Sequence, residues 1–358
     1  MMNQETYDYI LEILSRESSF NEGIRQLKQR WPTVLESFGE KTLRSIQAQY
    51  YVRRMRRNHF HHYGRDTREK YYRLYKDAKA KNEKNVIMRL AAKNDISPCL
   101  LARIILEEYY CNDVEHGRVH DRNEGRGALP PGFMTDCIRD IAKLPNPELA
   151  MEIYETMLLD NFYGPAVDSI KRSIGVEYEI ILKAQCRKAG LSFIDETQMR
   201  EEGYDKTPDI RLQVPVMINK RVINWIESKA SFGDPINHQQ YMIDQYLPYK
   251  NRFGPGAVIY WFGFVQELAE TGERGILLLT SFPETGQIVH LKDMHEQEKD
   301  SIGFCLVRKM DKIDDDDYNV SDLCHVEMDS KFSNYVDPMF DSDKEDDLTS
   351  ELSAVQSG

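Results

Sequence analysis

The chain has 358 residues, a hydrophobic fraction of 41% and a formal net charge of -12. This length fits one large domain or two to three modest ones, and the hydrophobic fraction is sufficient for a real core. The longest apolar run, residues 256–265, is about half as long as a membrane-spanning helix requires, so we expect a soluble protein with no membrane segment.

The charge is unevenly placed along the chain. Fifteen acidic residues and three lysines lie between Asp311 and Glu351, which leaves the preceding part of the chain close to neutral. We therefore expect residues 310–358 to form an acidic, disordered tail. Between Tyr51 and Lys84, twelve Lys or Arg residues stand against four acids. Such a segment either attracts a polyanion such as DNA or forms an ordinary solvated helix face.

The six cysteines are scattered and contain no CxxC pair, and the N-terminus does not resemble a secretion signal. This pattern indicates reduced thiols, and we expect the protein in the nucleus and cytoplasm.

The first third of the chain reads as helices. Apolar residues recur at helical spacing in residues 5–14, 18–30 and 40–57, and Trp31-Pro32 interrupts the pattern. Short helices with short connections are typical of a helix-turn-helix-like unit, which we assign to residues 1–64.

A second helix-turn-helix-like unit is expected in residues 65–162. Its central part predicts a helix, a turn at Asn94–Ser97 and a second helix with Ser97 as N-cap and Pro98 as first residue. This spacing resembles a DNA-binding helix-turn-helix, and it is also common in helical bundles. Residues 112–132 are polar and rich in Gly and Pro, which predicts a loop before another helix at residues 145–165.

From Pro165 onward the pattern is mixed. Residues 166–190 predict a helix with Gly190 at its C-terminal cap. Two alternating segments joined by a turn near residues 217–220 predict a β-hairpin. Next come a helical segment and two continuous apolar runs of the kind found in strands buried on both faces, at residues 235–256, 257–268 and 274–282. With one further short strand before Thr207, these elements predict a small sheet flanked by helices.

The hairpin carries charged residues at its open end. Alternation along a strand puts Ile223, Trp225, Glu227 and Lys229 on one face. Asp209 begins the partner strand, so an antiparallel pair brings it near Glu227 and Lys229. Two adjacent carboxylates repel each other unless a cation lies between them, and carboxylate oxygens are ligands that Mg²⁺ or Mn²⁺ prefers. The alternative is an exposed Glu–Lys pair beside an unrelated Pro-Asp turn.

Several stretches together resemble a known family. Residues 173–193, the Thr207-Pro208-Asp209 triplet, residues 225–234, residues 244–264 and residues 274–278 resemble the eukaryotic codanin-interacting nucleases. Their TPD-motif domain is similar to archaeal Holliday junction resolvases of the PD-(D/E)xK superfamily. The resemblance implies an α+β protein in which the helical N-terminal region precedes a restriction-endonuclease-like α/β/α nuclease domain at residues 163–309.

The resemblance also assigns roles. Asp209 matches the acid of the PD motif, and Glu227 and Lys229 match the ExK motif. Glu179, four residues after Gly175, matches the helix carboxylate, with Glu177 as the alternative. We therefore expect Asp209 and Glu227 to bind Mg²⁺ or Mn²⁺, Glu179 to assist through water and Lys229 to act on the nucleophile.

The following helix offers a Gln-x-x-x-Tyr match from Gln245 to Tyr249, with Gln245 expected to contact the substrate or Lys229. Pro248 inside this motif disturbs a regular helix. For His238, just before it, both a phosphate contact and an exposed position in the first turn of the helix are open.

The implied function is metal-dependent hydrolysis of phosphodiester bonds in structured DNA, with codanin as partner in chromatin assembly and erythroid maturation. A homodimer is also implied, because a resolvase makes paired cuts in a junction. The alternatives are a catalytically silent scaffold that binds codanin and DNA, and a DNA binder that uses the helical units alone.

Overall fold

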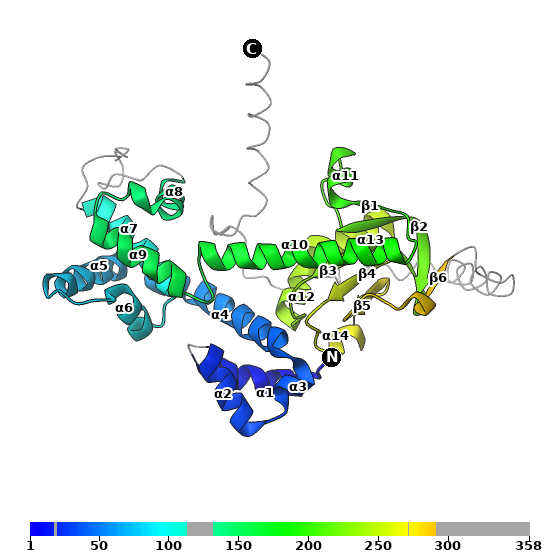
Figure 1. Cartoon of the computed structure of the whole chain (residues 1–358), viewed down its shortest axis with the longest axis horizontal. Helices are drawn as coiled ribbons and strands as arrows, with labels where there is room; N and C mark the ends of the chain where they lie inside the picture. The colour runs from blue at the N-terminus through cyan, green and yellow to red at the C-terminus, as the bar shows by residue number, and fades with distance from the viewer. Residues whose placement is uncertain (18–19, 113–131, 271, 291–358) are drawn as a thin grey trace, which may run out of the picture. The chain divides into compact units, whose positions relative to one another are not determined.

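The computed structural model describes residues 1–17, 20–112, 132–270 and 272–290 (Figure 1). The acidic tail and nearly all of the loop expected at residues 112–132 lie outside these ranges. The described chain is α+β, as expected, with helices up to the middle of the sequence and a mixed six-stranded sheet after it. The domain boundaries proposed from the sequence stay predictions.

The N-terminal helices follow the predicted pattern. They are α1 (Gln4–Ser15), α2 (Phe20–Arg30), α3 (Val34–Phe38), α4 (Glu40–Tyr63) and α5 (Arg65–Ala80). The side chain of Asn3 caps α1 by accepting a hydrogen bond from the backbone of Thr6. Ile10, Ile13 and Leu14 form its buried stripe.

The next helices include the second predicted helix-turn-helix pair. They are α6 (Val86–Asn94), α7 (Pro98–Asn112), α8 (Phe133–Arg139), the 3₁₀ turn η1 (Ile141–Lys143) and α9 (Pro147–Leu159). The turn and the Ser97 cap are where the sequence predicts them, with the Ser97 hydroxyl accepting from the Leu100 N–H at 3.4 Å. However, most side chains of α7 are buried, so this helix offers little surface to a DNA groove, and a DNA-reading role for it is unsupported.

The sheet region begins with the long helix α10 (Pro165–Lys188). Gly190 follows it with φ of +69° and ends it as predicted. The remaining elements are β1 (Phe193–Asp195), α11 (Glu196–Glu201), β2 (Ile210–Ile218), β3 (Arg221–Lys229), α12 (Pro235–Tyr241), the π-helical segment η2 (Met242–Tyr246), α13 (Leu247–Phe253), β4 (Gly256–Tyr260), α14 (Glu267–Glu270), β5 (Ile276–Leu279), η3 (Thr285–Gln287) and β6 (Ile288–His290).

The strands are ordered β1-β2-β3-β4-β5. Both β1 and β6 pair with β2: β1 pairs with its first residues and β6 with its last. The pairs β1–β2 and β2–β3 are antiparallel, whereas β3–β4 and β4–β5 are parallel. The short strand expected before Thr207 is β1. The two apolar runs give shorter strands than predicted, and β4 ends before a turn with Gly263 at φ of +82°.

One expectation about the hairpin is wrong. The pairing of β2 with β3 shifts between Arg211 and Val216, next to Pro215, which has no N–H to donate to a ladder. As a result Ile223 packs in the same hydrophobic cluster as Ile226, on the face opposite Trp225. The strict alternation assumed from the sequence holds only from Trp225 onward.

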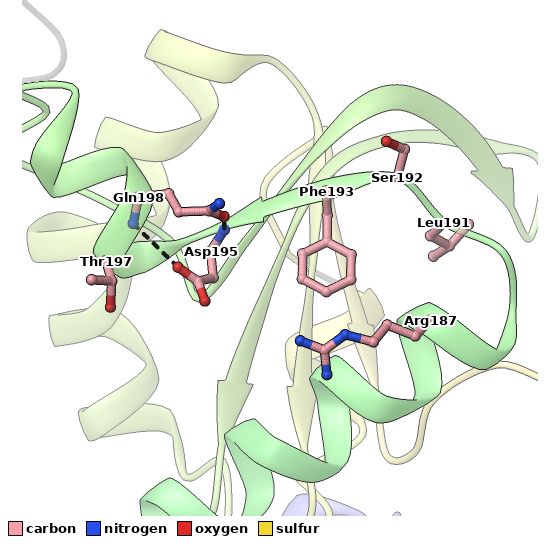
Figure 2. A pocket seen from close by; sticks show the side chains of 7 residues that line it. All are labelled: Arg187, Leu191, Ser192, Phe193, Asp195, Thr197 and Gln198. Carbon is pink, nitrogen blue, oxygen red and sulfur yellow. Dashed lines mark hydrogen bonds between the residues drawn. The ribbon is translucent and has the colours of Figure 1, made fainter.

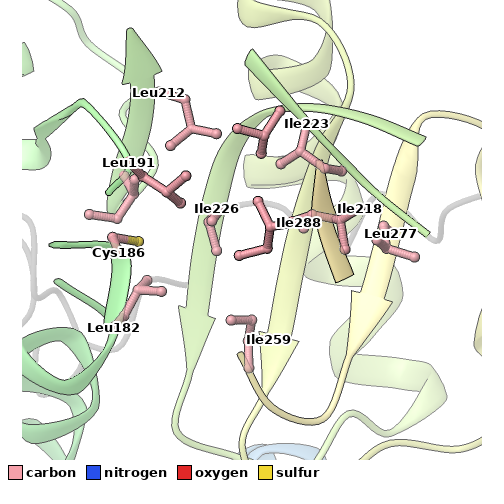
Figure 3. Close-up of a cluster of buried hydrophobic side chains, with 13 residues drawn as sticks. Leu182, Cys186, Leu191, Leu212, Ile218, Ile223, Ile226, Ile259, Leu277 and Ile288 are labelled. Atoms are coloured by element: carbon pink, nitrogen blue, oxygen red, sulfur yellow. The ribbon is translucent and has the colours of Figure 1, made fainter. Parts of the chain in front are cut away.

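Two hydrophobic clusters cover the two faces of the sheet. On one face Leu182 and Cys186 of α10 pack in a cluster with Ile226 and Ile259 (Figure 3). On the other face, side chains from η2 and α13 pack against the sheet in a cluster whose aromatic residues include Trp225, Tyr246 and Tyr249. The sheet therefore forms the middle of three layers, and α10 crosses one of its faces (Figure 1).

Candidate functional site

The hairpin turn and the shift in β2–β3 pairing next to Pro215 together set the register that brings the predicted acidic residues together. Asn219 and Lys220 have φ of +51° and +61°, which is typical of a two-residue hairpin turn. At the open end Ile210 pairs with Ile226, so the next position outward sets Asp209 directly opposite Glu227. The Asp209 N–H donates to Glu227 Oε2 at 3.3 Å, and Asp209 Oδ2 accepts from the Ser228 N–H at 2.6 Å.

Lys229 joins the same cluster. Its Nζ lies 2.7 Å from Glu227 Oε1 and 2.7 Å from Gln245 Oε1. The ammonium group also lies 4.7 Å from the ring centroid of Tyr241, a cation–π distance. The side chains of Lys229 and Glu227 are 15% and 6% exposed, so this is a largely desolvated ion pair. The structure thus brings together four of the five residues predicted for the site, Asp209, Glu227, Lys229 and Gln245.

The electrostatics of the cluster are those of crowded, buried acids. Burial, and then the neighbouring Glu227 carboxylate, raise the pKa of Asp209 well above its ordinary value. Burial alone would lower the pKa of Lys229. The neighbouring Glu227, Tyr241 and Asp209 raise it by more, so the net pKa lies above its ordinary value and Lys229 stays charged. The cluster therefore disfavours its own negative charge and favours a cation.

The structure distinguishes the two candidate glutamates of α10. Burial and the nearby Glu196 raise the pKa of Glu179, which also interacts with Glu227 and Lys229 across the sheet end. Glu177 is exposed and its charge acts on Lys41, at a different place. Of the two glutamates, Glu179 is the one whose charge interacts with the hairpin cluster, and its role in the site stays a prediction.

The oxygen atoms of the cluster suit a hard divalent cation, since Asp209 and Glu227 are adjacent acids with a third, Glu179, close enough to interact with both. Among the described residues, no three His, Cys, Asp or Glu side chains are already drawn together as a ligand group. The chemistry of the carboxylate donors nevertheless fits Mg²⁺ or Mn²⁺.

The helix that supplies Gln245 is irregular, as Pro248 predicts. The π-helical segment η2 contains Gln245, and α13 starts directly after it with Pro248 in its first turn. Proline cannot donate the i→i−4 hydrogen bond, and π segments are frequent at functional sites. Tyr249 of the same motif packs edge-on against Trp225 at 5.4 Å and is buried, so its role is structural.

The side chain of His238 is buried in the structure, not exposed. It is 7% exposed, and its Nδ1 lies 2.9 Å from the Tyr260 hydroxyl, which in turn lies 3.1 Å from the Tyr246 hydroxyl. The exposed position is therefore wrong, and the phosphate contact stays a prediction. The physical reason is that its helix packs this side against the aromatic cluster.

The sequence gives no sign of the contribution of α4 to this region. Three of its side chains, at four-residue spacing, contact the loop that follows Lys229. Ser45 Oγ accepts from the Phe232 N–H at 2.9 Å, Gln49 Nε2 donates to the Phe232 carbonyl at 2.8 Å, and Arg53 forms an ion pair with Asp234 at 3.0 Å. Asp234 is fully buried and caps α12 through two backbone N–H groups. The only available signal is the spacing itself, which does not name its partner.

Comparison with known proteins adds the family. Residues 145–282 match a family model described as a protein of unknown function with a TPD sequence motif, so the site belongs to a TPD-motif protein. The chain is 41% identical over 286 residues to CDAN1-interacting nuclease 1 of Mus musculus and of Homo sapiens, covering 79% of this chain and 96% of each relative. The Xenopus laevis protein of that name is 39% identical over 301 residues, which cover 83% of this chain and 94% of the relative.

The chain belongs to the CDAN1-interacting nuclease 1 family. No solved structure matches it. In the part of the chain that the structure describes, no helix is both long and apolar enough to cross a membrane.

Proposed function

We propose that this protein is a metal-dependent DNA nuclease whose centre is the hairpin cluster. The observation that carries the proposal is the convergence of Asp209, Glu227, Lys229 and Gln245 from three elements, with two hydrogen bonds of 2.7 Å on the lysine ammonium. Phosphodiester hydrolysis requires acids that hold a cation and a positive group near the attacked phosphorus. The names of the relatives contain the word nuclease, which agrees with this proposal.

Asp209 and Glu227 would hold Mg²⁺ or Mn²⁺, and Glu179 would assist through water. Such a cation, when bound, lowers the pKa of water and stabilises charge on a phosphoryl group. Lys229 stays charged beside Glu227 and would orient the nucleophile and neutralise developing negative charge. Gln245 holds the lysine in place through its side-chain oxygen.

The three-layer arrangement supports a restriction-endonuclease-like domain. Antiparallel β1–β2–β3 continues into parallel β4 and β5, with α10 on one face and α12–α13 on the other. We propose structured DNA, such as flaps or four-way junctions, as the substrate class, and a homodimer for paired cuts.

The basic helices α4 and α5 would provide phosphate contacts, although part of their charge is already committed. Arg53 pairs with Asp234, Arg54 with Asp95, and Arg68 with Glu107 and Glu108. The contribution of this segment to DNA affinity should therefore be smaller than its local charge suggests.

Codanin is the proposed protein partner, because the relatives are named for an interaction with CDAN1. We place this interaction in chromatin assembly and erythroid maturation. A second candidate function is a catalytically silent scaffold for codanin and DNA. It is favoured by the Lys229–Glu227–Gln245 contacts, which satisfy one another without a ligand.

The test is cleavage of labelled single-stranded, duplex, flap and four-way-junction DNA in Mg²⁺, Mn²⁺ or EDTA. Wild type should be compared with Lys229→Ala and with a control variant, Lys250→Ala. Lys250 lies on α13 and pairs with Glu273. Metal-dependent cleavage that is lost only in Lys229→Ala supports the nuclease. Equal cleavage by both variants contradicts the assigned centre, and absence of cleavage with intact DNA binding favours the scaffold.

A further inference from the structure

An open pocket of about 650 Å³ lies between the C-terminal end of α10, β1 and the start of α11 (Figure 2). Its lining combines a cation, an aromatic ring, two hydroxyl side chains and one acid: Arg187, Leu191, Ser192, Phe193, Asp195, Thr197 and Gln198. None of these residues belongs to the hairpin cluster. The mixed polar and aromatic lining raises the question of which ligand it suits.

The guanidinium group of Arg187 is the distinctive feature of this pocket. Its Cζ lies 5.7 Å from the centroid of the Phe193 ring, and Figure 2 shows the guanidinium beside the ring. No carboxylate of the described chain forms an ion pair with Arg187. A cation–π contact with an aromatic ring restrains the guanidinium while leaving its N–H groups available, which suits recognition of phosphate.

The one acid in the lining is already engaged. Asp195 Oδ1 accepts from the Gln198 N–H at 3.2 Å, and Asp195 Oδ2 pairs with Lys183 Nζ at 3.0 Å. Its charge is therefore balanced by Lys183 from the preceding turn of α10. An anion in the pocket would meet the cationic Arg187 and a neutralised Asp195–Lys183 pair.

The position of the pocket relates it to the proposed nuclease centre. Glu179, Lys183 and Arg187 follow one another at four-residue spacing, so they lie along one side of α10. With a rise of 1.5 Å per residue, Glu179 and Arg187 are separated by about 12 Å along the helix axis. For a duplex whose axis lies along α10, one strand advances 3.4 Å per nucleotide along that axis, so this separation corresponds to about three to four nucleotides.

We infer that Arg187, held by Phe193, is a phosphate-binding subsite for the nucleic-acid strand, about three to four nucleotides from the scissile phosphate. This inference rests on the proposed function for its register. Arg187 would contact the phosphate directly, and Phe193 is a positioning residue that fixes the guanidinium plane. The subsite would extend the substrate contact from the hairpin along α10 to the outer edge of the sheet.

The test is the salt dependence of DNA binding, measured by fluorescence anisotropy with the full chain and a labelled four-way junction in EDTA. Loss of one phosphate contact reduces the slope of log K against log salt by about 0.7 to 0.9. Wild type should therefore lose about threefold more affinity than Arg187→Ala between 50 and 200 mM salt. Phe193→Leu should weaken binding with less change in slope, since the charge remains.

Lys188→Ala is the matched control. It removes a cation from the next position of α10 that does not line the pocket. Three results would each overturn the subsite. They are an Arg187→Ala slope equal to that of wild type, an equal loss of slope in Lys188→Ala, and absence of DNA binding by wild type. Circular dichroism confirms that the variants are folded.

A second readout tests the register. Single neutral methylphosphonates are placed at successive positions from the cleavage site, and binding by wild type and Arg187→Ala is compared. One substitution three to four nucleotides away should weaken wild type and leave Arg187→Ala unchanged. Uniform effects at all positions would refute the subsite. Because binding is measured in EDTA, failure of the subsite is distinguishable from failure of cleavage, which Lys229→Ala tests separately.

Discussion

Replacement of Arg53 by methionine tests how α4 is attached to the loop that follows Lys229. Arg53 is 18% exposed and Asp234 is 0% exposed, and their ion pair measures 3.0 Å. Removing one partner of a buried pair costs about 3–5 kcal/mol, because the other charge remains buried without compensation. Asp234 keeps its bonds to the N–H groups of Ile236 and Asn237, so we expect the lower end, about 3 kcal/mol.

The matched control uses the adjacent arginine of α4. Arg54 pairs with Asp95, whose side chain is 60% exposed, so Asp95→Asn should cost at most about 1 kcal/mol. The free energy of unfolding is measured by urea titration, with unchanged slope as evidence that only stability has changed. A third variant, Arg53→Met with Asp234→Asn, removes the buried charge while asparagine still caps α12, and it should recover much of the loss.

Two outcomes would refute this reasoning. If Arg53→Met costs no more than Asp95→Asn, the Asp234 carboxylate is not a buried charge that depends on Arg53. If the loss of unfolding free energy in the double variant equals the sum of the losses in Arg53→Met and Asp234→Asn, the two side chains are not coupled. Either result would show that the ion pair between Arg53 and Asp234 does not stabilise the attachment of α4 to the loop that follows Lys229.

Three further predictions concern the cluster and its surroundings. Glu179→Gln should reduce metal-dependent cleavage about 10- to 100-fold while Glu177→Gln stays near wild type, and equal rates would contradict the assignment. Burial lowers the pKa of His238 to about 4, so the unfolded chain binds a proton at a higher pH than the folded chain. The free energy of unfolding therefore falls as the pH drops from about 6.5 to 4, by up to about 1.4 kcal/mol per pH unit. His238→Asn should remove this slope in pH-dependent thermal unfolding, and a retained slope would assign it to another group. Gly256→Ala would place a Cβ 2.1 Å from the Trp225 ring and should cost about 1–3 kcal/mol in urea unfolding, whereas a neutral effect would show that the ring moves freely.

Local signals in the sequence predict much of the fold. The hairpin, its turn, the C-terminal cap at Gly190 and the Ser97 cap depend on neighbouring residues, and the structure has all of them. The closeness of Asp209 to Glu227 is predicted by the hairpin, whereas their direct pairing depends on the shift in register next to Pro215. The disturbed helix at Pro248 is likewise a local effect, and it appears as the π-helical segment η2.

The features that the sequence does not reveal depend on distant partners. Arg53 and Asp234 are separated by 181 positions, so helical spacing cannot identify their contact. The burial of α7 comes from other helices packed around it, whereas its local pattern also suits an exposed recognition helix. Ile223 changes face because pairing with β2 shifts beside Pro215, a property of two strands that one strand's alternation does not contain.

The hairpin cluster is tested most directly by single-turnover cleavage of a four-way junction by wild type and Asp209→Asn, with Mg²⁺ or EDTA and with DNA affinity measured in parallel. Asparagine keeps the size of the side chain and removes the carboxylate. We predict Mg²⁺-dependent cleavage by wild type, none by Asp209→Asn, and equal DNA affinity for both. Cleavage by Asp209→Asn at the wild-type rate would show that hydrolysis does not depend on this cluster.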